Sequence, residues 1–253
     1  MNFNPFDLTG KTIVVTGASS GIGRQCAIDC SRMGARVIII ARNPERLLET
    51  FDSLSGDGHM SYVCDLSDPI KVKETADAIS MVVGKVNGIV NCAGVSTTLP
   101  LKLMTHDKME EMMKVNVIAS FDLTRELSKV KRMEEGSSII FVASVMGCVG
   151  ESGKSLYSMT KGALIAGARS LACEFAKRRI RVNTISPGAI LTPINAKLPH
   201  MADPERKAAL ESKHLLGLGE TSDISNGVIY LLSDAARWIT GQNIVVDGGY
   251  TAK

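Results

Sequence analysis

The stretch Thr12–Gly23, TIVVTGASSGIG, decides the fold of this chain. Thr12–Thr16 is a short β-branched run of the kind that forms a buried strand, and Gly21 opens a stretch with helical periodicity. Gly17, Gly21 and Gly23 lie at the junction, where backbone N–H groups at the start of a helix can approach a pyrophosphate. The stretch therefore predicts a strand, a phosphate-binding turn and a helix.

Two other interpretations compete for this turn. Its spacing, Thr-Gly-x-x-x-Gly-x-Gly, differs from the G-x-G-x-x-G fingerprint, and glycines between a strand and a helix can form only a tight turn. Gly17, Ser19 and Gly21 also match the G-x-S-x-G nucleophile elbow of hydrolases. That elbow needs an oxyanion-hole N–H from a loop after an earlier strand, and no strand is predicted before Thr12. Phosphate binding is therefore favoured over hydrolysis.

Composition and charge narrow the class of protein. The 253 residues, 45% apolar and 22% charged, suffice for one large core, so we expect a single domain over residues 1–253. A net charge of +3 without a sustained basic run argues against a nucleic-acid partner. Met1–Lys11 lacks a signal peptide and no segment has the ~20 apolar residues of a membrane span, so we expect a cytoplasmic protein with no membrane partner. The six cysteines lack Cys-x-x-Cys pairs, and we expect buried thiols and no metal site.

Short β-branched runs alternate with helical stretches along the whole chain. This pattern predicts a single-domain, doubly wound (Rossmann-type), seven-stranded parallel sheet with helices on both faces. The predicted strands are Thr12–Thr16, Arg36–Ala41, Ser61–Cys64, Gly88–Asn91, Ser138–Ala143, Arg181–Ser186 and Asn243–Val246. The clearest predicted helices are Gly21–Met33, Pro44–Leu54, Met112–Lys131, Leu156–Lys177 and Ser222–Ser233. The irregular interval Gly188–Gly219 is too long for an ordinary connection, and it predicts a substrate lid at about residues 189–218.

Tyr157 and Lys161 are the strongest candidates for catalysis. Residues at i and i+4 share a helix face, so the lysine ammonium can favour the phenolate. A cation at ~4 Å in a medium of dielectric ~20 contributes on the order of 4 kcal/mol, or roughly three pH units. We therefore expect Tyr157 to act as an acid/base near neutrality. Together with Ser144 and the glycine turn, the pair indicates hydride transfer to or from a nicotinamide, although a ring packed under a lysine stem gives the same spacing.

The residues after the second predicted strand bear on the choice of dinucleotide. An NAD-selective site places a carboxylate there, on the adenosine ribose, whereas this chain has Ala41 and Arg42. A guanidinium suits a 2′-phosphate and predicts NADP; the alternative is a solvated loop arginine. Asp65 follows the third strand, where it either accepts from the adenine amino group or caps the helix beginning near Asp68.

The glycine turn, Ser144 and the Tyr157–Lys161 pair belong to a larger, ordered set of motifs. It comprises Thr16-Gly17-x-x-x-Gly21-x-Gly23, Asn91-Cys92-Ala93-Gly94, Asn116, Ser144, Tyr157-x-x-x-Lys161, Pro187-Gly188 and Asp247-Gly248-Gly249. In this order the motifs resemble those of the short-chain dehydrogenase/reductase family across essentially the whole chain. The resemblance implies that Tyr157 protonates the carbonyl oxygen during reduction and that Ser144 hydrogen-bonds the same oxygen. It implies that Lys161 holds the nicotinamide ribose and lowers the pKa of Tyr157, and that Asn116 anchors a water passing protons to Lys161.

The resemblance also implies a cofactor site at the carboxyl ends of the strands. Its predicted residues are Gly17, Ser19, Ser20, Gly21, Ile22, Gly23, Arg42, Asp65, Leu66, Asn91, Ala93, Gly94, Tyr157, Lys161, Pro187, Gly188, Ile190 and Thr192. Two residues depart from the family pattern. Cys92 replaces the usual second asparagine, and Ser20 stands where many NADP-dependent members have a basic residue, which leaves Arg42 to recognise the 2′-phosphate largely alone.

These features predict an NADP(H)-dependent oxidoreductase that interconverts a ketone and a secondary alcohol. The alternatives are an NAD-linked secondary-alcohol dehydrogenase for a sugar or steroid-like substrate, with NAD(H) as cofactor, and a catalytically silent nucleotide-binding scaffold. The overall pattern resembles the 3-oxoacyl-carrier-protein reductases, but Glu135 and Cys173 stand where we align their carrier-docking arginines. A small-molecule carbonyl or alcohol is therefore the expected substrate.

An apolar substrate pocket and an oligomer complete the expectations. The candidate pocket residues are Val95, Leu99, Val145, Met146, Val149, Ile194, Leu198 and Met201. The family resemblance implies a homotetramer or homodimer formed through the helices Met112–Lys131 and Leu156–Lys177 and the C-terminal segment.

Overall fold

A seven-stranded parallel sheet forms the centre of the protein, whose computed structural model describes residues 4–192 and 203–252. The strands are β1 (Thr12–Thr16), β2 (Arg36–Ala41), β3 (Met60–Val63), β4 (Val86–Asn91), β5 (Met133–Val142), β6 (Arg181–Pro187) and β7 (Asn243–Val246). They lie in the order β3-β2-β1-β4-β5-β6-β7, and each neighbouring pair is parallel. The predicted doubly wound sheet is confirmed. Its strand order reverses between β1 and β4, and ligands of such sheets bind at the carboxyl ends beside this switch point.

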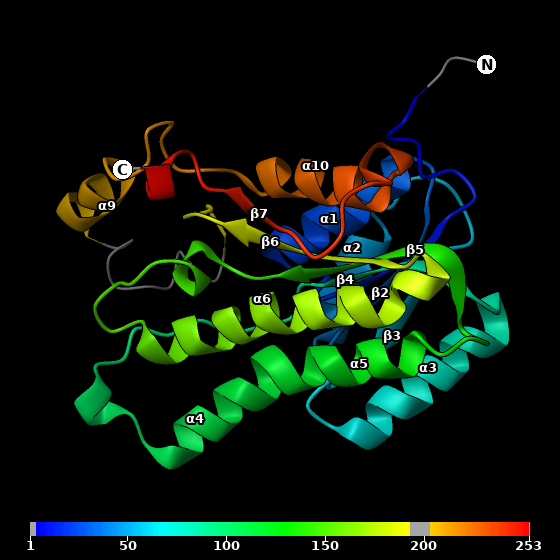
Figure 1. Cartoon of the computed structure of the whole chain (residues 1–253), viewed down its shortest axis with the longest axis horizontal. Helices are drawn as coiled ribbons and strands as arrows, with labels where there is room; N and C mark the ends of the chain where they lie inside the picture. The colour runs from blue at the N-terminus through cyan, green and yellow to red at the C-terminus, as the bar shows by residue number, and fades with distance from the viewer. Residues whose placement is uncertain (1–3, 193–202, 253) are drawn as a thin grey trace.

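Helices cover both faces of the sheet (Figure 1). The helices are α1 (Gly21–Arg32), α2 (Pro44–Phe51), α3 (Pro69–Val83), α4 (His106–Met113), α5 (Ala119–Leu127), α6 (Ser155–Phe175), α9 (Pro204–Glu211) and α10 (Thr221–Leu232). In Figure 1, α1 and α10 lie above the sheet, whereas α3, α5 and α6 lie below it. Each face has its own apolar core, and the strands contribute alternate side chains to the two cores, which is why they read as nearly continuous apolar runs.

Several element boundaries differ from those predicted. β5 starts at Met133 instead of Ser138, because Met133 pairs with Val86 before the register shifts and Gly136 turns at φ 75°. The helix predicted over Met112–Lys131 is a longer rod that begins with α4, passes through the π-helical segment Lys114–Ile118 and ends with α5.

α3 is the helix expected to begin near Asp68, whereas α9 was not predicted. α3 begins where Asp68 accepts hydrogen bonds from the N–H groups of Ile70 and Lys71, with Pro69 in the first turn. Asp68 is therefore the cap, and Asp65 is not. α9 lies inside the interval predicted to be irregular, and residues 193–202 of the predicted lid lie outside the described residues. Among the helices of the described ranges, none has the length and apolarity of a bilayer span.

Candidate active site

The glycine turn after β1 is packed too closely for any side chain at two of its positions. Gly17 has φ 65°, and a Cβ there would lie 2.9 Å from the Ala93 backbone. A Cβ at Gly23 would lie 2.4 Å from the Gly17 carbonyl oxygen. Thr16 fixes the same contact, because its Oγ1 accepts hydrogen bonds from the N–H groups of Cys92 (3.0 Å) and Ala93 (3.1 Å). The glycine turn Thr16–Gly23 and the motif Asn91–Gly94 thus pack together after β1 and β4. Their close packing leaves backbone groups accessible to a ligand.

A cavity of about 560 Å³ extends from this turn along the carboxyl ends of the strands. All but one of the predicted cofactor residues line it: Gly17, Ser19, Ser20, Gly21, Ile22, Gly23, Arg42, Asp65, Leu66, Ala93, Gly94, Tyr157, Lys161, Pro187, Gly188, Ile190 and Thr192. Asn91 is the exception, and its predicted contact with the cofactor stays a prediction. Its side chain is buried, and Nδ2 donates to Thr124 Oγ1 of α5 at 3.1 Å.

A second arginine, absent from the sequence prediction, lines the cavity beside Arg42. Arg46 lies in the first turn of α2, and its N–H donates to Asn43 Oδ1 at 2.8 Å, which caps the helix. The Asn43-Pro44 pair is a recognisable helix start, so the first-turn position of Arg46 was accessible from the sequence. Nearby, Asp65 Oδ1 accepts from the N–H and the hydroxyl of Ser67, and these bonds help to lower the pKa of Asp65.

Ser144 follows the end of β5, and Tyr157 lies in the first turn of α6. Ser144 is buried and begins the short turn Val145–Gly147, in which Ser144 Oγ accepts from the Met146 N–H at 3.2 Å. The Ser144 side chain lies close enough to the Tyr157 hydroxyl to act to lower its pKa. The two hydroxyls predicted to share one carbonyl oxygen are therefore near each other.

Lys161 lies beside Tyr157 but does not lower its pKa as predicted. Lys161 Nζ donates to the Val142 carbonyl oxygen at 2.8 Å and stands 5.6 Å from the centroid of the Tyr157 ring. Burial raises the pKa of Tyr157 to about 12, while the neighbouring Ser144 side chain acts in the opposite direction. The spacing of four residues brought the two groups together, but desolvation of the phenol outweighs the predicted attraction.

Asn116 lies in the π-helical segment and is almost fully buried. Its Oδ1 accepts from the Val95 N–H at 2.8 Å, and its Nδ2 donates to the Val95 carbonyl oxygen at 2.9 Å. A Cβ placed on Gly94 would lie 3.1 Å from Asn116 Oδ1 and 3.6 Å from Lys161 Nζ, so both polar groups converge on Gly94. Asn116 thereby fixes the loop after β4; its predicted role in anchoring a water stays a prediction.

A smaller cavity of about 290 Å³ adjoins the first. Five residues line both cavities: Ser96, Ser144, Tyr157, Gly188 and Ile190. Of the predicted apolar pocket residues, Val145 and Met146 line the smaller cavity and Val95 lines the larger one. Leu99 and Val149 line neither, and Ile194, Leu198 and Met201 lie outside the described residues.

His214 joins the segment after α9 to the wall of the smaller cavity. The Ala189 N–H donates to His214 Nε2 at 3.1 Å, so the ring proton is on Nδ1, which donates to the Leu210 carbonyl oxygen at 2.9 Å. The side chain is buried and tilted against the Tyr250 ring, with centroids 4.8 Å apart. The segment that follows α9 is thereby fixed to the loop after β6.

The expectation that the cysteine thiols are buried is met by only some of them. Cys26, Cys30 and Cys64 are buried, whereas Cys148 and Cys173 are exposed. No group of three or more metal-ligating side chains occurs within the part of the chain that the structure describes.

The burial of the Lys161 ammonium is unfavourable for folding, and its removal is expected to change the thermal stability. Burial lowers the pKa of Lys161 to about 8, so unfolding takes up a proton between pH 8 and 10.5 and the penalty is complete below pH 8. That pKa shift corresponds to a destabilisation of the folded protein by about 3 kcal/mol. The hydrogen bond to Val142 offsets about 1 kcal/mol of it. Lys161→Met is therefore expected to raise the thermal midpoint of the cofactor-free protein by several degrees at pH 7 and by less at pH 10.

Circular dichroism melting at the two pH values measures this gain, with Lys102→Met, at an exposed lysine, as the control. A loss of stability at pH 7 would show that the Val142 bond outweighs the burial of the charge.

Comparison with known proteins places this geometry in a family. A family model described as enoyl-(acyl carrier protein) reductase matches residues 17–251. A tropinone reductase homologue of Arabidopsis thaliana is 35% identical over 248 residues, covering 96% of this chain and 91% of that protein. The 3-oxoacyl-[acyl-carrier-protein] reductase of Homo sapiens is 34% identical over 240 residues, covering 94% and 97%.

Solved structures agree with these relatives. A putative short-chain alcohol dehydrogenase from Sinorhizobium meliloti superposes with a TM-score of 0.91 at 30% identity, covering 99% of this chain and 100% of that one. A putative NAD(P)-dependent gluconate 5-dehydrogenase from Beutenbergia cavernae, with bound NADP, gives 0.88 at 32% identity with the same coverage. The chain belongs to the short-chain dehydrogenase/reductase family of NAD(P)-dependent oxidoreductases.

Proposed function

We propose that the protein interconverts a ketone and a secondary alcohol with NADP(H) as the hydride carrier. The observation that carries the proposal is that Ser144 and Tyr157 line both cavities. A carbonyl in the smaller cavity would lie beside both hydroxyls and next to a dinucleotide in the larger one. Hydride transfer needs this arrangement of an acid/base between two ligands.

The residues of the larger cavity fit a dinucleotide. Gly17 and Gly23 leave no room for a Cβ, which brings backbone N–H groups at the start of α1 against the cavity, and a helix N-terminus favours phosphate. Lys161, which lines the same cavity, would contact the nicotinamide ribose. The cofactor, when bound, supplies or accepts the hydride at its nicotinamide ring.

Tyr157 and Ser144 would manage the proton and the carbonyl oxygen. Because burial raises the pKa of Tyr157 to about 12, the phenol is protonated at neutral pH, which is the form that reduction requires. The Tyr157 hydroxyl would donate its proton to the oxygen as negative charge develops there. The Ser144 hydroxyl would hydrogen-bond the same oxygen and hold it in place.

The preference for NADP(H) is attributed to Arg42 and Arg46. Both line the larger cavity at the end where the adenosine ribose would lie, and a guanidinium pair suits a 2′-phosphate. Arg42→Ala and Arg46→Ala are each expected to weaken NADPH binding by about tenfold and to change NADH binding by less than about threefold. Titration of both dinucleotides against both variants measures this, with Arg32→Ala, which lines neither cavity, as the matched control.

An NAD-linked dehydrogenase is the second candidate. Asp65 lies close enough for Arg42 to lower the pKa of its carboxyl group, and this negative charge partly offsets the arginine. Unchanged discrimination between NADPH and NADH in both arginine variants would favour this candidate.

A panel of ketones and secondary alcohols, assayed with each dinucleotide by nicotinamide absorbance, tests the reaction. We expect turnover of at least one carbonyl, with higher kcat/KM for NADPH than for NADH. Cofactor binding without turnover of any ketone or alcohol would favour the nucleotide-binding scaffold instead.

We also propose a homotetramer or homodimer. Ile118 and Met159 are large apolar side chains that are 51% and 48% exposed on the two helical stretches predicted to form the interface. Light scattering of the purified protein measures the mass, and a monomer at micromolar concentration would contradict the proposal.

A further inference from the structure

Lys154 places a buried ammonium in the smaller cavity, outside the catalytic set. The residue precedes Tyr157 by three positions, at the start of α6, and is 7% exposed. Its Nζ stands 5.9 Å from the centroid of the Tyr157 ring. Nζ donates to the Thr97 carbonyl oxygen at 3.3 Å, its single hydrogen bond to residues 4–192 and 203–252. Because an ammonium has three N–H donors, two remain for a ligand in the cavity.

The charges around the smaller cavity do not balance. Among the residues that the structure describes, its charged lining residues are Glu151, Lys154 and Lys213, two cations and one anion. Glu151 Oε1 pairs with Lys213 Nζ at 3.6 Å, and no carboxylate of the described ranges lies within ion-pair distance of Lys154. A buried cation without a paired anion is unfavourable, and burial accordingly lowers the pKa of Lys154 although Glu151 opposes this. A single negative charge on a substrate would complete the balance.

The contact with Thr97 does not explain why a lysine is needed here. The loop that follows β4 is already fixed by the hydrogen bond from the Leu99 N–H to the Gly153 carbonyl oxygen, at 2.7 Å. Asn116 fixes the same loop by its two bonds to Val95. A neutral donor at position 154 would serve the Thr97 carbonyl oxygen equally well.

We propose that Lys154 binds the carboxylate of an oxo acid whose ketone is reduced at Tyr157. This deepens the proposed function and rests on it. With Nζ 5.9 Å from the Tyr157 ring and a cavity of about 290 Å³, the carboxylate and the reacting carbonyl are separated by few bonds, as in a 2-, 3- or 4-oxo acid. One uncompensated ammonium matches one carboxylate charge better than the double charge of a phosphate monoester. The carboxylate is unchanged in the reaction: the ketone carbon gains the hydride and its oxygen gains the proton.

The test compares short oxo acids with their methyl esters, which keep the carbon skeleton and remove the charge. Wild-type protein is expected to reduce one of the four- to six-carbon 2-, 3- or 4-oxo acids with a kcat/KM about 10- to 100-fold above that of its ester. Lys154→Gln keeps a donor for Thr97 and is expected to remove this preference by lowering kcat/KM for the acid alone. Lys154→Arg keeps the charge and is expected to restore part of it.

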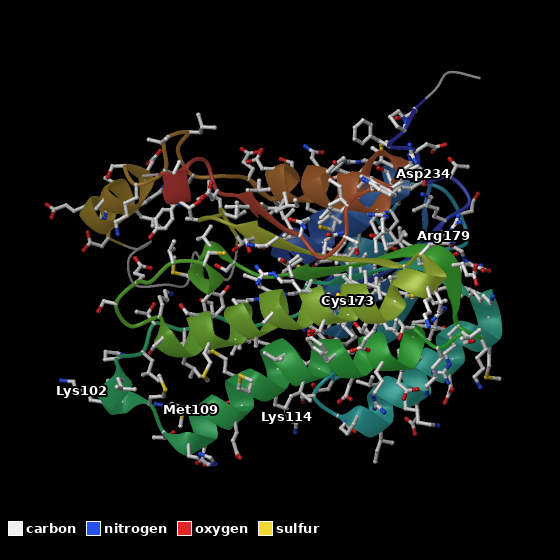
Figure 2. All side chains as sticks on the ribbon, in the orientation of Figure 1. Lys102, Met109, Lys114, Cys173, Arg179 and Asp234 are labelled. Carbon is white, nitrogen blue, oxygen red and sulfur yellow. The ribbon has the colours of Figure 1, made fainter. Side chains whose placement is uncertain are left out.

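The control is Lys102→Gln, which makes the same charge change at an exposed residue on the outer edge of the molecule (Figure 2). Its acid-to-ester ratio should stay within about threefold of wild type, because exposed charges are screened. Calorimetric titration of 3-oxobutanoate into wild type and Lys154→Gln, each saturated with NADP⁺, adds a readout that does not need turnover, and only wild type should bind it.

Three outcomes overturn the assignment. They are equal kcat/KM for acids and esters in wild type, equal losses for acid and ester in Lys154→Gln, and equal losses of the acid in Lys154→Gln and Lys102→Gln. In each case Tyr157-dependent reduction of neutral ketones would still support the proposed function. Absence of all carbonyl turnover would instead reject the proposed function, and calorimetry showing no binding of 3-oxobutanoate would then reject the role of Lys154 as well.

Discussion

Replacement of Tyr157 by phenylalanine is expected to abolish ketone reduction while NADPH still binds. The variant keeps the ring that lines both cavities and removes the hydroxyl that lies near Ser144. General acid catalysis contributes about 10²- to 10⁴-fold, so kcat should fall by at least about 10³-fold with the dissociation constant of NADPH within about threefold of wild type. Nicotinamide absorbance measures the first quantity and cofactor fluorescence the second.

Tyr230→Phe is the matched control, because Tyr230 lies on α10 and lines neither cavity. It should keep wild-type kcat. Ser144→Ala should lose less than Tyr157→Phe, since Ser144 orients the oxygen and does not transfer the proton. Near-normal turnover by Tyr157→Phe would remove the phenol from the mechanism, and simultaneous loss of NADPH binding would show that the variant had disturbed the larger cavity.

The fold and the glycine turn that lines the larger cavity were predictable because their requirements are local. A glycine at 17 or 23 is needed wherever a strand, a turn and a helix pack this closely, and the clash distances in the structure show why. The β-branched runs predicted the strands because a doubly covered parallel sheet buries both faces. The ends of the strands were predicted less accurately, because a continuous apolar run does not mark where pairing begins. β5 extends back to Met133 through a register shift that the hydrophobic pattern does not encode.

Long-range packing decided what the sequence could not predict. The spacing of Tyr157 and Lys161 predicted their proximity, but the direction of the pKa shift of Tyr157 depends on its desolvation by neighbours distant in sequence. Likewise, Asn91 belongs to a motif that borders the site, yet its side chain turns to Thr124 of α5. Lys154 resembles an ordinary surface lysine until the fold encloses it beside Thr97 and Tyr157.

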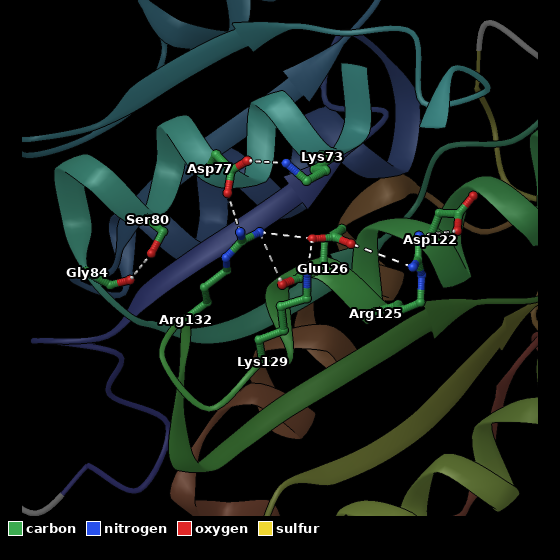
Figure 3. A network of polar contacts seen from close by, with 9 residues as sticks. All are labelled: Lys73, Asp77, Ser80, Gly84, Asp122, Arg125, Glu126, Lys129 and Arg132. Carbon is green, nitrogen blue, oxygen red and sulfur yellow. Dashed lines mark hydrogen bonds and ion pairs between the residues drawn. The ribbon is translucent and has the colours of Figure 1, made fainter. Parts of the chain in front are cut away.

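Replacement of Glu126 by glutamine is expected to lower the free energy of unfolding by about 3 kcal/mol, because it removes one partner of a buried ion pair. The Glu126 and Arg132 side chains are each 4% exposed, and Arg132 Nη1 donates to Glu126 Oε2 at 3.1 Å. Arg132 also pairs with Asp77 of α3, and Lys129 donates to Glu126 at 2.5 Å (Figure 3). The network joins α3, α5 and the start of β5 at the end of the sheet opposite the cavities.

The pH dependence of this stabilisation follows from the carboxyl group. Burial acts to raise the pKa of Glu126, but its bonds to Lys129, Arg125 and Arg132 outweigh burial and hold the pKa below its ordinary value of 4.5. The stabilisation is therefore complete above about pH 4.5 and is lost as the pH falls through the lower pKa of the folded protein. The difference between wild type and Glu126→Gln should be constant near neutrality and shrink in acid.

Thermal melting at pH 7 should show a midpoint about 6–12 °C below wild type for Glu126→Gln. Asp122→Asn, which removes a more exposed partner of Arg125, should change the midpoint by no more than about 4 °C. Equal effects of the two variants would show that burial adds nothing to the Glu126–Arg132 pair. At temperatures where Glu126→Gln remains folded, its kcat should equal that of wild type, because the network contacts neither cavity. Glu126→Gln and Tyr157→Phe thus separate the two demands on this fold: one loses stability and keeps turnover, while the other loses turnover and keeps the fold.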